Sequence, residues 1–147
     1  MSFPASPCAK NTIQLILPAD YQYLNVLTAC VEAVLERIET LPEPETIIYN
    51  VQLAVQEICN NIVEHAYEQN PDGLIKITFQ FNQAQTQLVV DIFDEGSPFD
   101  PQLVPEPDFE VGQIGGWGLY LINKLMDEVT YTHAVDYNHW RLLKKLQ

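Results

Sequence analysis

The chain has 147 residues, of which 47% are hydrophobic, and its seven Lys and Arg stand against twenty Asp and Glu for a formal net charge of −13. This length and composition predict one ordinary globular domain and exclude a disordered chain. The acidity argues against binding to nucleic acid or to an anionic membrane surface, because both depend on Lys and Arg, and it favours a partner with a basic surface. Acidity that only aids solubility is an equally open explanation.

The first ten residues, MSFPASPCAK, contain two prolines and no periodicity, which predicts a flexible terminus before a single domain at residues 11–147. They have no signal-peptide core, and no apolar run of the chain approaches 18 residues, so we expect a soluble cytoplasmic protein. The three cysteines (Cys8, Cys30 and Cys59) are widely spaced. Neither a zinc site nor a disulfide framework is therefore expected.

Residues 12–17, TIQLIL, alternate and are rich in β-formers, which predicts a first strand. A helix should follow with Asp20 as its N-cap and run to about Glu39, before the breaker Leu41-Pro42-Glu43-Pro44. The expected buried stripe of this helix consists of Tyr23, Val26, Leu27, Cys30, Val31, Val34, Leu35 and Ile38.

The longest periodic stretch is Val51 to Gln69, VQLAVQEICNNIVEHAYEQ, in a helix that we expect to begin near Glu45. Its apolar residues recur at steps of three and four, as on one face of an α-helix. Glu57 and Asn61 lie one turn apart on its polar side. A carboxylate and a carboxamide in this arrangement can place a base and a metal ligand in one site, although a solvated helix face produces the same pattern.

The second half of the chain predicts a sheet interrupted by one long connection. Two alternating segments joined by a short polar stretch predict an antiparallel hairpin. The connection after it, residues 94–116, is long enough to be a functional lid or a disordered stretch. The element order predicts an α+β two-layer sandwich, with a mixed, mainly antiparallel sheet and helices on one face. The expected elements are strands at 74–81, 87–93, 128–134 and 140–146 and a helix at about 118–126.

Two further motifs flank this connection. DEGSPF, residues 94–99, begins where the second hairpin strand ends, and an Asp followed by Gly there can accept a hydrogen bond from a ligand amine beside closely approaching backbone. GQIGGWG, residues 112–118, leads into an apolar helix, where free backbone amides can meet an anion. A plain turn and a glycine hinge explain the same two patterns without a ligand.

Taken together, ExxxN on a helix, DxGxPF after a strand and GGxGL at a helix start resemble the GHKL ATP-binding (Bergerat) fold. More closely, the chain resembles the anti-sigma-factor serine kinases of the RsbW and SpoIIAB type, from about residue 12 to residue 146. EICNNIVEHAY resembles their N-box, DEGSPFDP their first glycine box and GGWGLYLINKLMDEVTY their second. The resemblance implies a protein-serine/threonine kinase that uses ATP and Mg²⁺. Its implied substrate is a small STAS-domain partner, and a sigma factor is a further partner in such partner switching.

The same resemblance implies roles for individual residues. It makes Glu57 the general base toward the acceptor hydroxyl and Asn61 the Mg²⁺ ligand. It makes Asp94 the reader of the adenine amino group, with Gly96 letting the base pack closely. Residues 100–114 correspond to the lid over ATP. The remaining implied nucleotide-binding residues are Phe99, Gly115, Leu119 and the two glycines that face the phosphates, Gly116 and Gly118.

Two features depart from that family. Residues 100–116 contain no Lys or Arg, and Lys124 is the nearest basic residue after them. Asn25 stands where relatives carry an arginine implicated in partner contact. An alternative is therefore a nucleotide-binding module that sequesters a partner without phosphotransfer. A homodimer is also open, since Tyr23, Leu24 and Leu27 are suited either to a dimer contact or to the core.

Overall fold

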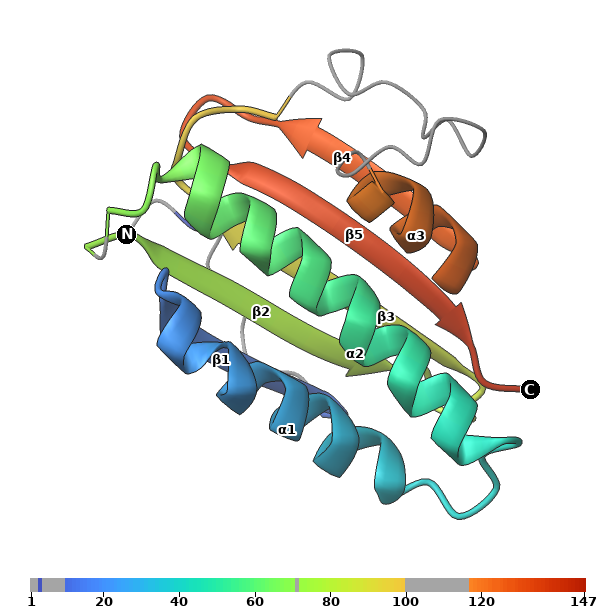
Figure 1. Ribbon diagram of the computed structural model, residues 1–147. Coiled ribbons are helices and arrows are strands. Elements are labelled where there is room, and N and C mark those ends of the chain that lie inside the picture. Colours follow the sequence, from blue (N-terminus) through green and yellow to red (C-terminus); the bar gives the residue numbers. More distant parts are fainter. Residues whose placement is uncertain (1–2, 4–9, 71, 100–116) are drawn as a thin grey trace.

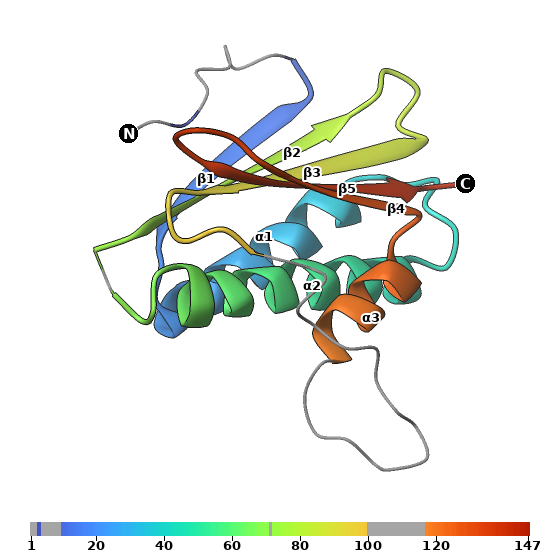
Figure 2. The same ribbon diagram turned by 90° about the horizontal axis from the view of Figure 1, so that it is seen from above.

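The computed structural model describes residue 3 and residues 10–70, 72–99 and 117–147. Its five strands form one sheet in the order β1-β2-β3-β5-β4, and all four pairings are antiparallel. The three helices of the described part of the chain lie on one face of this sheet (Figure 1 and Figure 2). The predicted α+β two-layer sandwich is confirmed. The elements are β1 (Thr12–Pro18), α1 (Leu24–Glu36), α2 (Pro44–Asn61), β2 (Leu74–Phe81), β3 (Gln87–Asp94), α3 (Trp117–Leu125), β4 (Glu128–His133) and β5 (Asn138–Lys145).

The core lies between the sheet and the helices. The alternation of β2 and β3 turns one set of their side chains toward the helices, and that set is buried against the apolar stripe of α2. The helix α2 crosses the middle of the sheet (Figure 1), so its stripe is the centre of the core. Fully buried members from these three elements are Val51, Ala54, Val55, Ile58, Cys59, Ile75, Ile77, Phe79, Leu88, Val90 and Ile92.

The first α-helix is shorter than predicted, but most of its predicted stripe is confirmed, because Leu27, Val31, Val34, Leu35 and Ile38 are buried. Asp20 is the N-cap of a single 3-10 turn at Tyr21–Tyr23, and its carboxylate accepts a hydrogen bond from the Gln22 N–H at 3.0 Å. The α-helix begins only after that turn. Tyr23 and Val26, predicted to be buried, are 38% and 43% exposed, whereas Leu24 is 4% exposed. Leu24 and Leu27 are therefore core residues. The expectation was wrong at Tyr23, which lies in the 3-10 turn and does not follow the α-helical period, and at Val26, because the buried stripe runs through Leu24 and Leu27 instead.

The second helix begins at Pro44, after Glu43 in a left-handed conformation with φ of 45°. Its α-helical part ends at Asn61, and the next turn, Ile62–Ala66, is a π-helix. We predicted regular helix to Gln69, but Glu68 and Gln69 both have positive φ and end the helical run.

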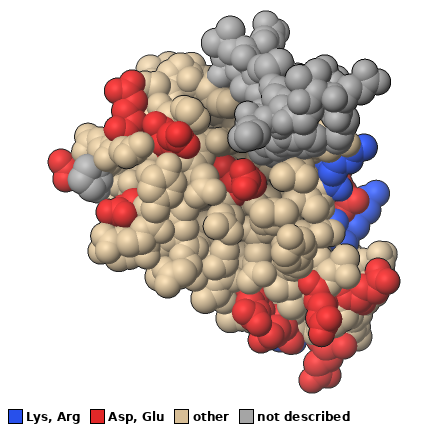
Figure 3. Space-filling view, in the orientation of Figure 1, with Lys and Arg blue, Asp and Glu red and all other residues tan. Residues whose placement is uncertain are grey.

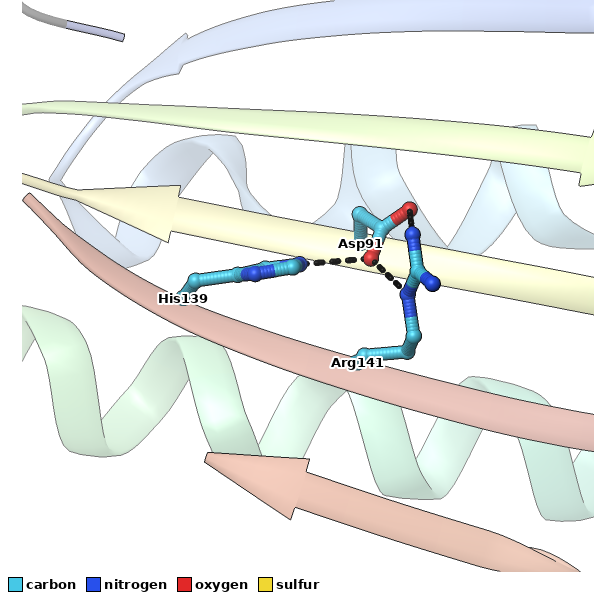
Figure 4. Close-up of polar contacts among 3 residues, drawn as sticks. All are labelled: Asp91, His139 and Arg141. Carbon is cyan, nitrogen blue, oxygen red and sulfur yellow. Dashed lines mark hydrogen bonds and ion pairs between the residues drawn. The ribbon is translucent and has the colours of Figure 1, made fainter. Parts of the chain in front are cut away.

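The face of the sheet away from the helices carries a charged cluster on β3 and β5 (Figure 4). The carboxylate of Asp91 accepts hydrogen bonds from His139 Nε2 at 2.6 Å and from Arg141 Nε at 2.8 Å. Burial would raise the pKa of Asp91, but the bonds from His139 and Arg141 outweigh it and leave the pKa below its ordinary value. The ring of His139 also stacks on Phe93, with centroids 4.4 Å apart. His139 is thus half-buried and hydrogen-bonded to Asp91, and Arg141 forms an ion pair with the same carboxylate.

Candidate functional site

The last turns of α2 hold the predicted base and metal ligand. Glu57 and Asn61 are separated by four positions, so their side chains project from the same flank of the helix. Between them, Ile58 and Cys59 are fully buried and fix the rotation of the helix. Both polar side chains are partly exposed, and no described residue forms a hydrogen bond with either one. Their oxygens can therefore meet a ligand.

The π-turn after Asn61 brings the end of this helix against the loop that follows β3. The carbonyl oxygen of Ala66 accepts a hydrogen bond from the Ser97 N–H at 2.8 Å. A Cβ on Gly96 would lie only 2.4 Å from that same carbonyl oxygen, so this position requires glycine. Single π-turns within helices occur frequently at functional sites. Here the turn joins the ExxxN helix directly to the DxGxPF loop.

Tyr67 forms a second link between this helix end and the loop. Its hydroxyl accepts a hydrogen bond from the Glu95 N–H and donates one to the Leu74 carbonyl, both at 2.7 Å. Burial raises the pKa of Tyr67 to about 12, with a smaller upward effect from Asp94. The phenol is therefore neutral at physiological pH and can serve as both donor and acceptor. No role for Tyr67 was predicted from the sequence.

Asp94 is the last residue of β3 and lies on the helix side of the sheet, where it is 1% exposed. Its Oδ1 accepts hydrogen bonds from the Gly96 N–H at 2.9 Å and from Asn138 Nδ2 at 2.8 Å. Burial raises the pKa of Asp94, and these two bonds oppose the rise. Burial, and then the charge of Asp94, also raise the pKa of the Cys59 thiol on α2. The carboxylate therefore lies near the same turns of α2 that carry Glu57 and Asn61.

Asn138 is a site residue that was not predicted from the sequence. It is the first residue of β5 and pairs with Asp94 in the sheet register, and it is 1% exposed. The signal in the sequence was a lone Asn at the start of a strand, which is uninformative until the β3–β5 pairing is known.

Phe99, predicted to contact the nucleotide, packs on two other aromatic residues. Its ring lies 5.3 Å from that of Trp140 and 5.8 Å from that of Tyr131, measured between centroids. Its N–H also donates to the Tyr131 hydroxyl at 2.7 Å. The structure therefore places Phe99 on the helix side of β4 and β5, close to the Asp94 network.

The phosphate-binding half of the prediction is described only in part. Gly115, Gly116 and the predicted lid at residues 100–114 lie outside the described residues. Gly118 and Leu119 fall in the first turn of α3, and Leu119 is half-buried. The helix α3 packs against α2 and is anchored by Ile122, which is fully buried. The helix start that follows the glycine motif is therefore attached to the helix that carries Glu57 and Asn61.

The donor set fits Mg²⁺ held through a nucleotide rather than a metal held by the protein alone. Among the described residues, no group of three or more His, Cys, Asp or Glu could hold a metal ion. Mg²⁺ prefers oxygen ligands, keeps several waters and commonly takes one or two protein ligands together with substrate phosphates. The amide oxygen of Asn61, which has no partner among the described residues, fits such a single contact.

The surface over the helices is mostly uncharged, with an acidic patch near its centre, further acidic side chains toward both ends and basic side chains at one edge (Figure 3). This is the face on which α2 and α3 lie (Figure 1). Within the described residues, no helix is both long and apolar enough to cross a bilayer.

The chain is similar in sequence to known proteins. A sequence model of the family described as "Histidine kinase-like ATPase domain" matches residues 17–144. The serine-protein kinase RsbW of Bacillus subtilis is 34% identical over 126 residues, with coverage of 80% of this chain and 75% of that protein. The serine-protein kinase RsbW of Halalkalibacterium halodurans is 30% identical over 130 residues, with coverage of 81% and 74%.

Solved structures show the same fold. The RsbU and RsbW domains of a Mycobacterium tuberculosis protein match with a TM-score of 0.67 and 18% identity, over 92% of this chain and 32% of that longer chain. The histidine kinase domain of a blue-light activated histidine kinase from Erythrobacter litoralis matches with a TM-score of 0.55 and 18% identity, over 95% and 66% of the two chains. At these identities the likeness concerns the fold alone.

Proposed function

The chain belongs to the histidine kinase-like ATPase domain family, and from this premise we propose that it is a protein-serine/threonine kinase that uses Mg·ATP. The observation that carries the proposal is the junction at the end of α2. There the helix with Glu57 and Asn61 is joined through Ala66 to the loop that begins at Asp94. This junction thus brings together a candidate general base (Glu57), a candidate metal ligand (Asn61) and a carboxylate that could recognise adenine (Asp94).

Asn61 and Glu57 have separate tasks in this proposal. Bound Mg²⁺ supplies charge neutralisation at the phosphate oxygens, and Asn61 would hold it with its amide oxygen. Glu57 lies one helical turn earlier and accepts the proton of the acceptor hydroxyl as the general base. Such a base contributes roughly 10²–10⁴ in rate. Positioning of the two reacting groups supplies much of the remainder, as is usual in phosphoryl transfer.

Asp94 and its loop select the nucleotide. A carboxylate can accept a hydrogen bond from the exocyclic amine of adenine and from no exocyclic oxygen. Gly96 would let the nucleobase pack closely beside it, and its missing Cβ also lets the loop lie against Ala66. The glycines of residues 112–118, ahead of α3, would present backbone amides to the phosphates.

The proposed protein substrate is a small STAS-domain protein that is phosphorylated on a serine or threonine. A sigma factor is the second proposed partner, held when the STAS protein is phosphorylated and released when it is not. Support comes from the RsbW relatives, which are named serine-protein kinases. Because the chain has a net charge of −13, we also expect the contact surface of the partner to be basic. The cytoplasm is the proposed location.

Phosphotransfer can be tested with labelled ATP and the small STAS-domain proteins of the host. The wild-type protein should transfer label to one of them, and Glu57→Gln should transfer far less while still binding Mg·ATP. Gln56→Glu is a matched control at the neighbouring position, with the opposite charge change, and it should keep most of the activity. Equal labelling by wild-type protein and Glu57→Gln would contradict the role of Glu57, and no labelled partner would contradict the kinase.

One observation favours a second function, a nucleotide-binding module that sequesters its partner without phosphotransfer. The observation is where the basic residues lie: all seven Lys and Arg belong to the described part of the chain, and none lies in residues 100–116. Arg141 is engaged by Asp91 on the far face of the sheet, Arg37 lies over the ring of Phe81, and Lys144 donates to the Leu125 carbonyl. Lys124 lies in the last turn of α3, with its Nζ 5.5 Å from the ring centroid of Tyr120. For this function, Mg·ATP should raise the melting temperature and strengthen partner binding, and no partner should take label.

A further inference from the structure

Asn138 and Asp94 form a buried polar pair at the edge of the candidate site. They face each other across the β3–β5 ladder, and each is 1% exposed. Buried amides and carboxylates are costly unless their hydrogen-bonding groups are satisfied. The partners of Asn138 therefore show what this side chain does.

The chemistry of its neighbours fixes the orientation of the Asn138 carboxamide. Nδ2 lies 2.8 Å from Asp94 Oδ1 and 3.0 Å from the Gly96 carbonyl oxygen, and both of these atoms can only accept from it. Oδ1 must then accept, and it does so from the Tyr131 hydroxyl at 3.2 Å and from His133 Nδ1 at 2.7 Å. Two donors and two acceptor sites are all that a carboxamide has. Asn138 has therefore no capacity left for a ligand.

The hydrogen bond from Asn138 fixes how the Asp94 carboxylate is oriented. Its Oδ1 is occupied by Asn138 Nδ2 and by the Gly96 N–H, whereas the described residues provide no hydrogen bond to Oδ2. A carboxylate that is held through one oxygen has a fixed rotation, so the other oxygen has a fixed direction. The same network includes Phe99, the last described residue before the predicted lid, because the Tyr131 hydroxyl accepts from the N–H of Phe99.

We propose that Asn138 is a positioning residue for nucleotide recognition: it holds Asp94 Oδ1 so that Oδ2 meets the exocyclic amine of the base. The inference rests on the proposed function, because it requires that the chain bind a purine nucleotide. It assigns discrimination to a residue on β5 that does not itself touch the nucleotide. A merely structural Asn138 would affect every nucleotide equally.

Two nucleotides separate these roles: Mg·ATP, and the Mg²⁺ complex of purine riboside triphosphate, which lacks the exocyclic amine. Dissociation constants for both are measured by calorimetry with wild-type protein, Asn138→Ala and Asn138→Asp. In Asn138→Ala, ATP should bind roughly 10-fold more weakly, as expected when a hydrogen bond to a charged group loses its support. The amine-free nucleotide should change by less than about 2-fold. Asn138→Asp places two carboxylates together and should lose at least as much preference for ATP.

Asn82 offers a matched control. Its Oδ1 accepts from the N–H groups of Thr86 and Gln87, both at 2.9 Å, in the β2–β3 turn. Asn82→Ala should lower the urea midpoint and leave the preference for ATP unchanged. Circular dichroism and urea unfolding establish that each Asn138 variant is folded before its affinities are compared.

The outcomes are distinct. A smaller ATP preference in either folded Asn138 variant supports the inference. If wild-type protein prefers ATP and the variants keep that preference, or if both nucleotides weaken equally, the role of Asn138 is overturned while the proposed function stands. If wild-type protein binds neither nucleotide, the proposed function fails and this inference fails with it.

Discussion

Gly96→Ala tests the junction between the ExxxN helix and the DxGxPF loop. The added Cβ would lie 2.4 Å from the Ala66 carbonyl oxygen, 2.5 Å from its carbonyl carbon and 2.8 Å from its Cβ. Two of these atoms are backbone, so relief requires the loop or the π-turn to move. Such a movement would strain or break the 2.8 Å hydrogen bond from Ser97 to Ala66.

The magnitude follows from two contributions. Overpacking by one methyl group typically costs about 1–3 kcal/mol. The lost hydrogen bond adds about 1 kcal/mol. For a domain of this size, the total corresponds to a fall in melting temperature of roughly 4–16 °C. Because the loop also carries Asp94, affinity for Mg·ATP should fall as well.

The assay is thermal unfolding, followed by calorimetric titration with Mg·ATP below the melting temperature. Ser97→Ala is the control: Ser97 is exposed, and the variant keeps the N–H that bonds Ala66. It should behave like the wild-type protein. A Gly96→Ala protein with wild-type melting temperature and affinity would show that the close contact does not hold the site together.

Three other substitutions test separate parts of the account. Burial raises the pKa of Asp94, so this group favours folding only below its unfolded-state pKa and loses that contribution as pH rises through the folded-state value. Asp94→Asn should therefore be at least as stable as wild-type protein in urea at pH 7, yet bind ATP much more weakly. The pKa of Asp91 is lowered instead, so Asp91→Asn should lose on the order of 1 kcal/mol at pH 7, and the loss should vanish as pH falls below the ordinary value of 3.8 through the folded-state pKa. Tyr67→Phe leaves the Glu95 N–H and the Leu74 carbonyl without this partner and should cost about 1–3 kcal/mol in urea unfolding.

The parts of the fold that follow from local periodicity could be predicted from the sequence. The stripe of α2, from Val51 to Ile62, is buried as its spacing requires. The β2–β3 hairpin also formed as predicted, because its alternation and polar turn specify a register without help from the rest of the chain. These two elements already place Asn61 on a helix flank and Asp94 at a strand end.

The parts that depend on long-range contacts could not be predicted. Tyr23 lies in the 3-10 turn before α1 and is exposed, whereas Leu24 is in the core. The pairing of Asp94 with Asn138 joins strands 44 positions apart and requires the sheet order. The π-turn that brings Ala66 to the loop also has no signal in the pattern of apolar residues. Close polar contacts of the site therefore came only from the structure.

The central claim is that α2 and the loop after β3 form one Mg·ATP site. Calorimetric titration of wild-type protein with ATP, with and without Mg²⁺, tests it most directly when it is repeated with Asn61→Ala. Asn60→Ala, at the preceding partly exposed position, is the control. We expect binding that Mg²⁺ strengthens in the wild-type protein and in Asn60→Ala, and a loss of that strengthening in Asn61→Ala. An equal Mg²⁺ effect in all three proteins, or no ATP binding by the wild-type protein, would contradict the claim.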